Sequence, residues 1–484
     1  MTPQHSPMSR PAAPKANSTA AEGVGTPVSR PAAPKANSTA GEGERTRLSR
    51  RKTIVATTIG NGLEFFDFTI YGFLALVIGK LFFPTFDSYG QLLLTVGSFG
   101  VGFIMRPLGG IVIGAYADRA GRKKAMTLTI FLMALGCAMI AFAPTYAQIG
   151  VAAPILIVLA RLIQGFSAGG EVGASTTLLV EHATPANRGY MASWQFASQG
   201  LGILLGAAVA GGLTAALGPQ GMEAWGWRVP FIIGMLIAPV GMYIRRHLDE
   251  SLETAGTPAA TGQRSSIAEV CSEHGRTVLA AILSVLGGTA AAYVVTFYMP
   301  TYAVRELGLP ATVALFAAAL MGLLSFVLSP LVGAVSDRVG RKPLIVWGRV
   351  AMALLIYPAF WWLNASPTPA VLFIVVGLLS IALVVQTAPA ITMLPEMFPK
   401  HVRASGMSLV YSVGVALFGG FSPLVSAWLV GASGNKLAPA WYLLGMTLVS
   451  LLGLLWLKDF TGRDIDDAAA HRPDAEPSSR PARA

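Results

Sequence analysis

Several ionisable side chains lie inside long apolar segments of the chain, where a charge is costly and therefore indicates a function. Glu64 and Asp67 are three residues apart, so they share one face of a helix, and Tyr71 continues that face. Arg106 and Arg161 lie at similar depth in two further apolar segments. Buried carboxylates can bind protons, and the planar fork of arginine binds carboxylate groups. The pattern predicts a buried site for an anion and a proton.

These charges could instead pair only to hold helices together, and some must pair, because an isolated buried charge shifts its pKa and neutralises. Packing alone does not require two acids and two arginines at one depth, since interhelical polar contacts contribute only about 0.6 kcal/mol on average. Glu171 adds a third acid to the first half of the chain, whereas the second half offers mainly Arg349, near the end of an apolar segment. We therefore interpret the first half as the part that binds the anion and the proton.

Long apolar segments must position these residues. Of 484 residues, 53% are hydrophobic and only 12% are charged, about half the charged fraction of a typical soluble domain. Many apolar runs reach the roughly 20 residues that a membrane-spanning helix needs. We predict an all-α polytopic membrane protein with twelve transmembrane helices in two pseudo-symmetric six-helix bundles, which excludes a soluble enzyme, a secreted disulfide scaffold and a disordered polymer. The expected spans are 53–79, 91–116, 125–143, 151–180, 190–217, 229–246, 277–303, 311–335, 343–363, 370–394, 404–431 and 440–457.

Polar stretches divide the chain into parts. The first of them lacks large apolar side chains and should be disordered, and it contains a 20-residue duplication. The longest internal polar stretch separates the spans into six and six, and a Ser-x-x-Glu capping box at Ser266 predicts a short surface helix within it. The expected parts are a disordered N-terminal tail (1–50), an N-terminal six-helix bundle (51–246), a cytoplasmic central loop (247–276), a C-terminal six-helix bundle (277–458) and a disordered C-terminal tail (459–484).

The net charge of +11 and the pI near 9.8 could indicate nucleic-acid binding. The basic residues instead lie in short segments between apolar spans, as they do in the cytoplasmic loops of membrane proteins. We therefore expect no nucleic-acid partner, a location in the cell inner membrane and both termini in the cytoplasm. Cys137 and Cys271 have no metal-ligand neighbours and are too few for a disulfide framework, so we interpret both as reduced bystanders.

Two charged motifs occur once in each half. Asp-Arg-x-Gly-Arg follows the second span and returns after the eighth, and a Glu–Arg pair follows both the fourth and the tenth spans. This recurrence indicates a duplicated six-helix unit, as in many transporters. Positive charge there would orient the chain, but orientation alone requires neither the acids nor the glycine. We predict a gate, closed in one conformation only, formed by Asp118, Arg119, Arg122, Glu181, Arg188, Asp337, Arg338, Arg341, Glu396 and Arg403.

With these motifs, residues 51–458 resemble the major facilitator superfamily and, within it, the metabolite:proton symporter family. The resemblance implies the twelve-helix fold and a substrate among organic acids, shikimate and compatible solutes. Runs such as ATPANRGYMASWQ are most similar to citrate and tricarballylate carriers, whereas Phe65-Phe66 departs from them. The motifs that carry the resemblance are Gly60-Asn61-x-x-Glu64-x-x-Asp67-Phe68, Arg106-Pro107-Leu108-Gly109-Gly110, the run RLIQGFSAGGE from Arg161 to Glu171, WGWRVPF from Trp225, and both Asp-Arg-x-Gly-Arg-Lys loops.

A tricarboxylate needs cations to leave water, so we assign the two central arginines to its carboxylates. Adding an anion to this site also calls for a proton, which we assign to Asp67, with Glu64 as the alternative. The predicted substrate-binding residues are Arg106, Arg161, Gln164, Asn61 and Tyr71. The predicted proton-coupling residues are Asp67, Glu64 and Glu171.

We therefore expect a secondary transporter that imports a citrate-like di- or tricarboxylate with protons by alternating access. The alternatives are a symporter of the same family for 2-oxoglutarate, shikimate or a betaine-type solute, and, from a different class, a non-transporting nutrient sensor. The sequence has no Walker lysine motif, nucleophile elbow or zinc-protease motif, so we expect no enzyme activity, no cofactor and no metal. The expected partners are a small organic anion, protons and the lipid bilayer, with the protein as a monomer.

Overall fold

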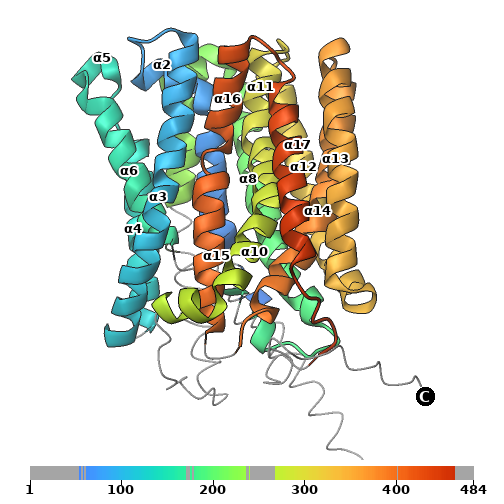
Figure 1. The fold of residues 1–484 in the computed structure, drawn as a ribbon. Coiled ribbons are helices and arrows are strands. Elements are labelled where there is room, and N and C mark those ends of the chain that lie inside the picture. Colours follow the sequence, from blue (N-terminus) through green and yellow to red (C-terminus); the bar gives the residue numbers. More distant parts are fainter. Residues whose placement is uncertain are drawn as a thin grey trace, which may run out of the picture. The chain divides into compact units, whose positions relative to one another are not determined.

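The computed structural model describes residues 54–463, except 56–57, 59–60, 121, 170–174, 177–178, 236–238, 240–266 and 400–401. Every regular element in these ranges is a helix, and most of the helices run along a common direction (Figure 1). The expected N-terminal tail, most of the central loop and residues 464–484 lie outside the described residues, and so does Glu171.

The N-terminal half begins with a bent span. Helix Asn61–Phe73 meets α2 (Ala75–Phe82) at an angle of 62°, where hydropathy alone predicts one straight helix. No proline marks the bend, but Gly72 beside it lies against the ring of Phe297 from the other half, so the cause is tertiary packing. The other helices of this half are α3 (Ser88–Ala120), α4 (Arg122–Ala141), α5 (Tyr146–Ile149), α6 (Ala152–Ala168), α8 (Arg188–Gly221), the π-helical turn η1 (Met222–Gly226) and helical residues 228–235.

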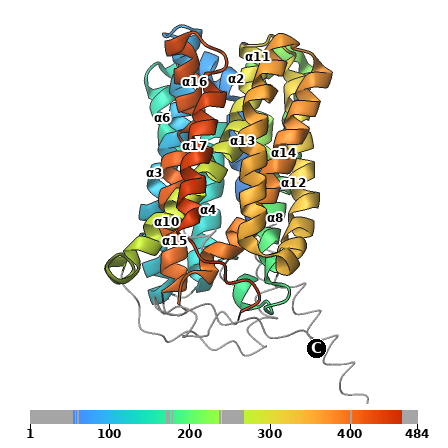
Figure 2. The ribbon, with the colours of Figure 1, turned by 45° about the vertical axis from the view of Figure 1, so that its right-hand side comes forward.

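The first span of the C-terminal half contains a π-helical turn. The helices of this half are α10 (Ile267–Tyr293), the π-helical turn η2 (Val294–Tyr298), α11 (Met299–Arg305), α12 (Ala311–Val339), α13 (Arg341–Ala365), α14 (Pro369–Glu396), α15 (Arg403–Phe418), α16 (Ser422–Ser433) and α17 (Ala438–Leu455). The backbone kinks at His274, so the first part of α10 is a separate short helix at the end of the bundle (Figure 2). The surface helix predicted from the capping box is therefore present, although Ser266 itself lies outside the described residues.

The two halves pack against each other through two sets of helices. α8 lies along α12, and α3 lies against α15 and α16. The first contact depends on Gly200 and Gly322, because a Cβ atom at either position would come within 2.5 Å of a backbone nitrogen of the opposite helix. Small residues allow such close helix crossings in membranes, where lipid provides no hydrophobic force to drive helices together.

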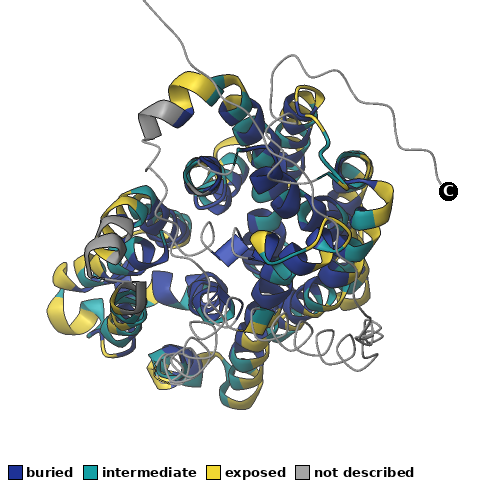
Figure 3. Ribbon diagram, turned by 90° about the horizontal axis from the view of Figure 1, so that it is seen from below, coloured by how far each residue is buried: buried dark blue, intermediate teal, exposed yellow. Residues whose placement is uncertain are grey.

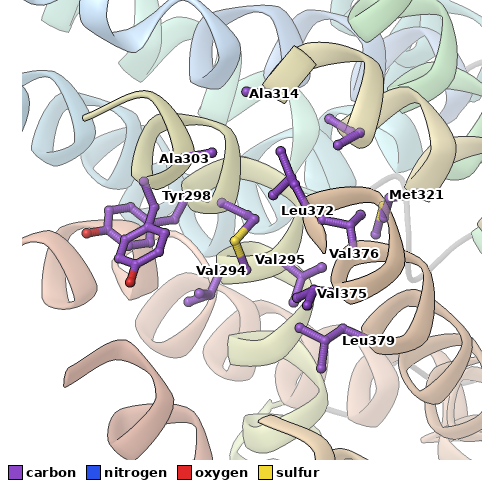
Figure 4. Packing of buried hydrophobic residues seen from close by; sticks show 14 of the residues in the cluster. Val294, Val295, Tyr298, Ala303, Ala314, Met321, Leu372, Val375, Val376 and Leu379 are labelled. Carbon is purple, nitrogen blue, oxygen red and sulfur yellow. The ribbon is translucent and has the colours of Figure 1, made fainter. Parts of the chain in front are cut away.

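A core of branched and aromatic side chains joins the helices of the C-terminal half. Val294 and Val295 of η2 lie beside Val375, Val376 and Leu379 of α14 (Figure 4). The π-helical turn of the seventh span therefore packs against the first half of α14. Turns of this kind are rare and occur mostly at functional sites.

The outside of the helix bundle is apolar. Large side chains such as Ile104, Phe131, Leu354 and Leu455 are exposed, while burial increases toward the centre of the bundle (Figure 3). A soluble protein rarely exposes so much apolar surface, which a bilayer would cover.

In the described ranges, eight helices are long and apolar enough to cross a membrane, or nine if the bent pair counts as one span. Two shorter apolar helices, Thr127–Ala141 and Ala152–Ala168, fall on further expected spans. The remaining expected span, 229–246, lies mostly outside the described residues. The all-α polytopic class is confirmed.

Residues 459–463, at the start of the predicted C-terminal tail, pack against the beginning of α13. The backbone nitrogen of Lys342 donates to the Asp459 carboxylate at 3.0 Å, and that of Arg341 donates to the Thr461 hydroxyl at 3.0 Å. The first N–H groups of a helix have no partner within the helix, so this segment supplies acceptors that the start of α13 needs. This part of the predicted tail is therefore in contact with the helix bundle.

Candidate functional site

Arg106 and Glu64 form a buried ion pair between α3 and the first helix. Their Nη2 and Oε1 atoms are 3.1 Å apart, and both side chains are almost completely buried. The guanidinium group of Arg106 also lies over the rings of Phe68 and Phe103, at 4.7 Å and 4.2 Å from their centroids. A central acid and a central arginine are thus paired in the structure, whereas the sequence indicated only that some of the buried charges must pair.

Arg106 lines a small cavity between the two halves. The cavity has a free volume of 10 Å³, which is about the space that one water molecule requires. Its wall combines one cation with hydroxyl groups from α15, and no carboxylate lines it among the described residues. The lining residues are Arg106, Ala168, Gly169, Ser408, Tyr411, Ser412 and Val415.

Arg161 lies in the same half but does not line this cavity. Its side chain is fully buried, and its Nη1 donates to Gln164 Oε1 at 2.7 Å. The rings of Phe68, Tyr71 and Phe99 surround the guanidinium group, with centroids at 4.8 Å, 4.4 Å and 5.3 Å. The two arginines predicted to share one ligand therefore occupy different surroundings, one at the cavity and one among aromatic rings.

Asp67 lies beside Arg161 in a cluster that the sequence did not indicate. Its carboxylate has hydrogen-bond contact with the Cys137 thiol of α4, and that sulfur accepts from Gln164 Nε2 at 3.1 Å. Cys137, which we interpreted as a bystander, is thus in contact with a predicted proton-coupling residue. Spacing along the chain could not have found this contact, because the partners come from three different helices.

Asn61 and Tyr71 bind neighbouring helices. Asn61 Nδ2 donates to the Gln195 carbonyl at 2.9 Å and to the Ser198 hydroxyl at 2.8 Å, both on α8. Asn61 Oδ1 accepts from Gln199 at 3.5 Å, and Gln199 also contacts Tyr411 of the cavity wall. The Tyr71 hydroxyl is 2.5 Å from that of Ser98 on α3.

At one end of the bundle, charged residues join the two halves. Arg188 at the start of α8 binds Glu396 at the end of α14, with Nη1 and Oε1 2.9 Å apart. Glu396 also binds Arg341 at 3.4 Å, and Arg341 binds Asp337 at 2.8 Å. The Asp337 carboxylate accepts from the backbone nitrogens of Gly189 at 2.7 Å and Tyr190 at 3.0 Å. An acid at a helix N-terminus is favourable because the first N–H groups lack helical partners.

We call this set of residues the Asp337 network, comprising Arg188, Gly189, Tyr190, Asp337, Arg341 and Glu396. The structure places the other predicted gate residues less centrally. Glu181 is exposed and lies 3.6 Å from Arg403, whereas Arg338 is exposed beside Asp337. Asp118 and Arg119 lie in the last turn of α3 and Arg122 begins α4, but their side chains are outside the described part of the chain.

The halves also touch at the opposite end. Arg305 at the end of α11 donates to the carbonyl of Ser88 at 3.0 Å, and the Tyr89 hydroxyl donates to the Trp428 carbonyl at 3.2 Å. Contacts among the described residues therefore join the halves at both ends of the bundle.

Sequence reasoning missed the contribution of α15 to the cavity. Ser408, Tyr411 and Ser412 are spaced along one face of a helix, and this spacing is the only signal that could have identified them as a group. No group of His, Cys, Asp or Glu side chains in the described ranges is arranged to hold a metal ion.

Comparison with known proteins is consistent with this architecture. The sequence profile of the Major Facilitator Superfamily matches residues 57–331 and 306–482. The chain belongs to this superfamily. It is 38% identical over 398 residues to "Citrate-proton symporter" from Salmonella typhi, covering 82% of this chain and 92% of that protein. It is also 34% identical over 440 residues to "Proline/betaine transporter" from Escherichia coli strain K12, covering 88% and 87%.

Solved structures show the same fold. The xylose transporter XylE from E. coli, in a partially occluded inward-open conformation, superposes with a TM-score of 0.68 at 19% identity, covering 86% of this chain and 99% of that one. A member of the Major Facilitator Superfamily is a transporter rather than an enzyme, which agrees with the absence of a catalytic motif in the sequence.

Proposed function

We propose that this Major Facilitator Superfamily protein imports a citrate-like di- or tricarboxylate together with protons. The observation that carries the proposal is Arg106 at the wall of the central cavity, facing hydroxyl groups of α15. A guanidinium group binds a carboxylate with two parallel hydrogen bonds. The hydroxyls of Ser408, Tyr411 and Ser412 can donate to further carboxylate or hydroxyl oxygens of the same substrate.

The ion pair between Arg106 and Glu64 supplies a reason for proton coupling. A substrate carboxylate that binds Arg106 competes with Glu64, and two carboxylates on one arginine leave an uncompensated negative charge. A proton on a nearby acid removes that charge, so anion and proton bind together. We assign this proton to Asp67, which lies one helical turn from Glu64, with Glu64 as the alternative carrier.

Alternating access follows from the contacts between the halves. We propose that the two six-helix bundles rock about the cavity, and that the Asp337 network and the contacts around Arg305 open in turn. The positive-inside rule places the Asp337 network and both termini in the cytoplasm. We propose that the protein is a monomer in the inner membrane.

A betaine-type solute is a second candidate, supported by relatives named as proline and betaine transporters. Phe99, Phe103, Tyr293 and Phe297 form a continuous aromatic cluster beside Arg106. Aromatic faces attract quaternary ammonium groups, while Arg106 would take the single carboxylate. Citrate is preferred, because relatives named as citrate-proton symporters have the higher identities and because Arg106 already occupies the face of Phe103.

The test is uptake of labelled citrate or labelled glycine betaine by proteoliposomes under an imposed pH gradient. We expect citrate to accumulate, an uncoupler to abolish the accumulation, and the Arg106→Ala variant to lose it. If only glycine betaine accumulates, the proposed mechanism stands, but the substrate is a betaine-type solute rather than citrate. Absence of uptake for both solutes, in vesicles shown to hold folded protein, would contradict the proposal and favour a non-transporting sensor.

A further inference from the structure

A chain of hydrogen bonds leads from Arg161 to Asp67 through residues of three helices. Arg161 Nη1 donates to Gln164 Oε1 at 2.7 Å, and Gln164 Nε2 donates to Cys137 Sγ at 3.1 Å. The Cys137 thiol in turn has hydrogen-bond contact with the Asp67 carboxylate. A buried thiol often serves only as a small apolar side chain, but this thiol stands between an amide and an acid.

Gly234 provides independent evidence that this arrangement is tightly held. A Cβ atom at Gly234 would come within 2.1 Å of Asp67 Oδ1 and 3.6 Å of Cys137 Sγ. The helical residues 228–235 therefore lie directly against the cluster, and the Asp67 carboxylate has no room to move toward Gly234. Because the Asp67 carboxylate cannot move toward Gly234, its hydrogen-bond partners determine how stable its ionised form is.

The cluster is separate from the cavity that contains Arg106. None of Asp67, Cys137, Arg161 and Gln164 lines that cavity. The two sites nevertheless share a wall, because Arg106 and Arg161 lie 4.7 Å and 4.8 Å from the centroid of the same ring, that of Phe68. A change of charge at Asp67 can thus act on the cavity without contact between Asp67 and the substrate.

We infer that Cys137 is a positioning residue that links protonation of Asp67 to Arg161 through Gln164. The inference rests on the proposed function and on Asp67 as the proton carrier. When Asp67 is ionised, the thiol donates to its carboxylate. When Asp67 takes up a proton from water, the acid no longer needs that donor, and the thiol keeps its own proton and can turn away. The cluster of Asp67 and Arg161 then changes from neutral to a charge of +1, which favours an anion at Arg106.

The sign of the effect follows from the hydrogen bond. A donor to the ionised carboxylate favours the charged form, so its loss lets the proton bind at higher pH. The charged or titratable groups that face Asp67 are Cys137 from α4 and Arg161 from α6, while Gly234 contributes only backbone. On its own helix, Glu64 is paired with Arg106. A thiol is a weak donor, so we expect Cys137→Ala to move the midpoint of uptake upward by about half a pH unit to one unit.

The experiment measures the pH profile of uptake in proteoliposomes for the wild type, Cys137→Ala and Cys137→Ser, using whichever of citrate or glycine betaine the wild type accumulates. Counterflow of the same solute without a pH gradient gives the KM for binding. We expect Cys137→Ala to shift the profile while the counterflow KM stays within about twofold. We expect Cys137→Ser, a stronger donor of similar size, to lower the midpoint below the wild-type value.

The matched control is Cys271→Ala, because Cys271 is the other free cysteine and is exposed at the start of α10; its profile should match the wild type. An unchanged midpoint in Cys137→Ala would overturn the inference, and so would a Cys137→Ser profile identical to that of Cys137→Ala. If Cys137→Ala does not fold, a serine variant with the wild-type midpoint or a higher one decides against the inference, whereas a lower midpoint supports it. Failure of the wild type to accumulate either solute would instead reject the proposed function, and the inference with it.

Discussion

Arg106 and Arg161 of the N-terminal half have different partners from Arg349 of the C-terminal half. In the N-terminal half, Arg106 binds the Glu64 carboxylate, and Arg161 is linked to Asp67. In the C-terminal half, Arg349 of α13 donates to the backbone carbonyls of Ser284 and Ser450, and its partners in the described ranges include no carboxylate. Carboxylates change charge when they bind protons, whereas backbone carbonyls do not. The comparison supports our proposal that the groups around Arg106 and Arg161 respond to protons, while Arg349 holds α10, α13 and α17 together.

The strongest test of this difference is the Arg106→Gln variant. Removing one partner of a buried ion pair typically costs about 3–5 kcal/mol, because the other charge remains unpaired. Here the same change also removes the cation that faces the substrate. We expect kcat/KM for uptake to fall at least about a hundredfold. Arg106→Lys keeps the charge but not the planar fork, so it should retain an intermediate activity; equal activities for the lysine and wild-type proteins would contradict bidentate binding.

The matched change in the other half is Arg349→Met. No acid is left unpaired by this substitution, and only hydrogen bonds to the Ser284 and Ser450 carbonyls and to the Ser284 hydroxyl are lost, each worth about 1.5–3 kcal/mol for a charged donor. We expect a lower melting temperature in detergent and a KM within about threefold of the wild type. If Arg349→Met abolished uptake in a folded protein, both halves would contain functional arginines and the contrast between them would be wrong.

Hydropathy and helical spacing predicted the spans and the shared face of Glu64 and Asp67, because both depend on residues that are neighbours along one helix. Contacts between helices join residues that are far apart in the sequence, so neither hydropathy nor helical spacing predicts them. The bend after Phe73 arises where Gly72 meets Phe297, and Cys137 meets Asp67 only because α4 packs beside the first helix. The sequence motifs identified which residues carry charge, but which arginine faces the cavity depended on how α3, α6 and α15 pack.

In the Asp337 network, a smaller effect on uptake is expected, and it can be tested by changing two adjacent residues. Asp337 accepts from two backbone nitrogens at the start of α8 and binds Arg341, whereas Arg338 is exposed. We expect Asp337→Asn to reduce uptake about tenfold, because weaker bonds across the halves make closure at this end less favourable by about 1–2 kcal/mol. Arg338→Gln should stay within about twofold. Equal losses in the two variants would show that loop charge, rather than contact between the halves, matters here.

The smallest expected effect concerns the segment that caps α13. Asp459 accepts from the backbone nitrogen of Lys342, and the carbonyl of Arg463 accepts from Arg188 of the other half at 3.4 Å. This segment therefore touches both halves when the Asp337 end is closed. Loss of a helix cap costs about 1 kcal/mol, so Asp459→Ala should slow uptake two- to fivefold with an unchanged KM.

Asp87→Ala is the control for this change, because Asp87 accepts from the backbone nitrogen of Gly90 near the start of α3, at the other end of the bundle. Both variants remove an acid that bonds a helix start, but only Asp459 lies in the segment that reaches Arg188. If the two slowed uptake equally, the effect of Asp459 would be ordinary helix capping. A larger loss for Asp459→Ala would instead mean that residues 459–463 help to hold the halves together, which makes this segment part of the gate.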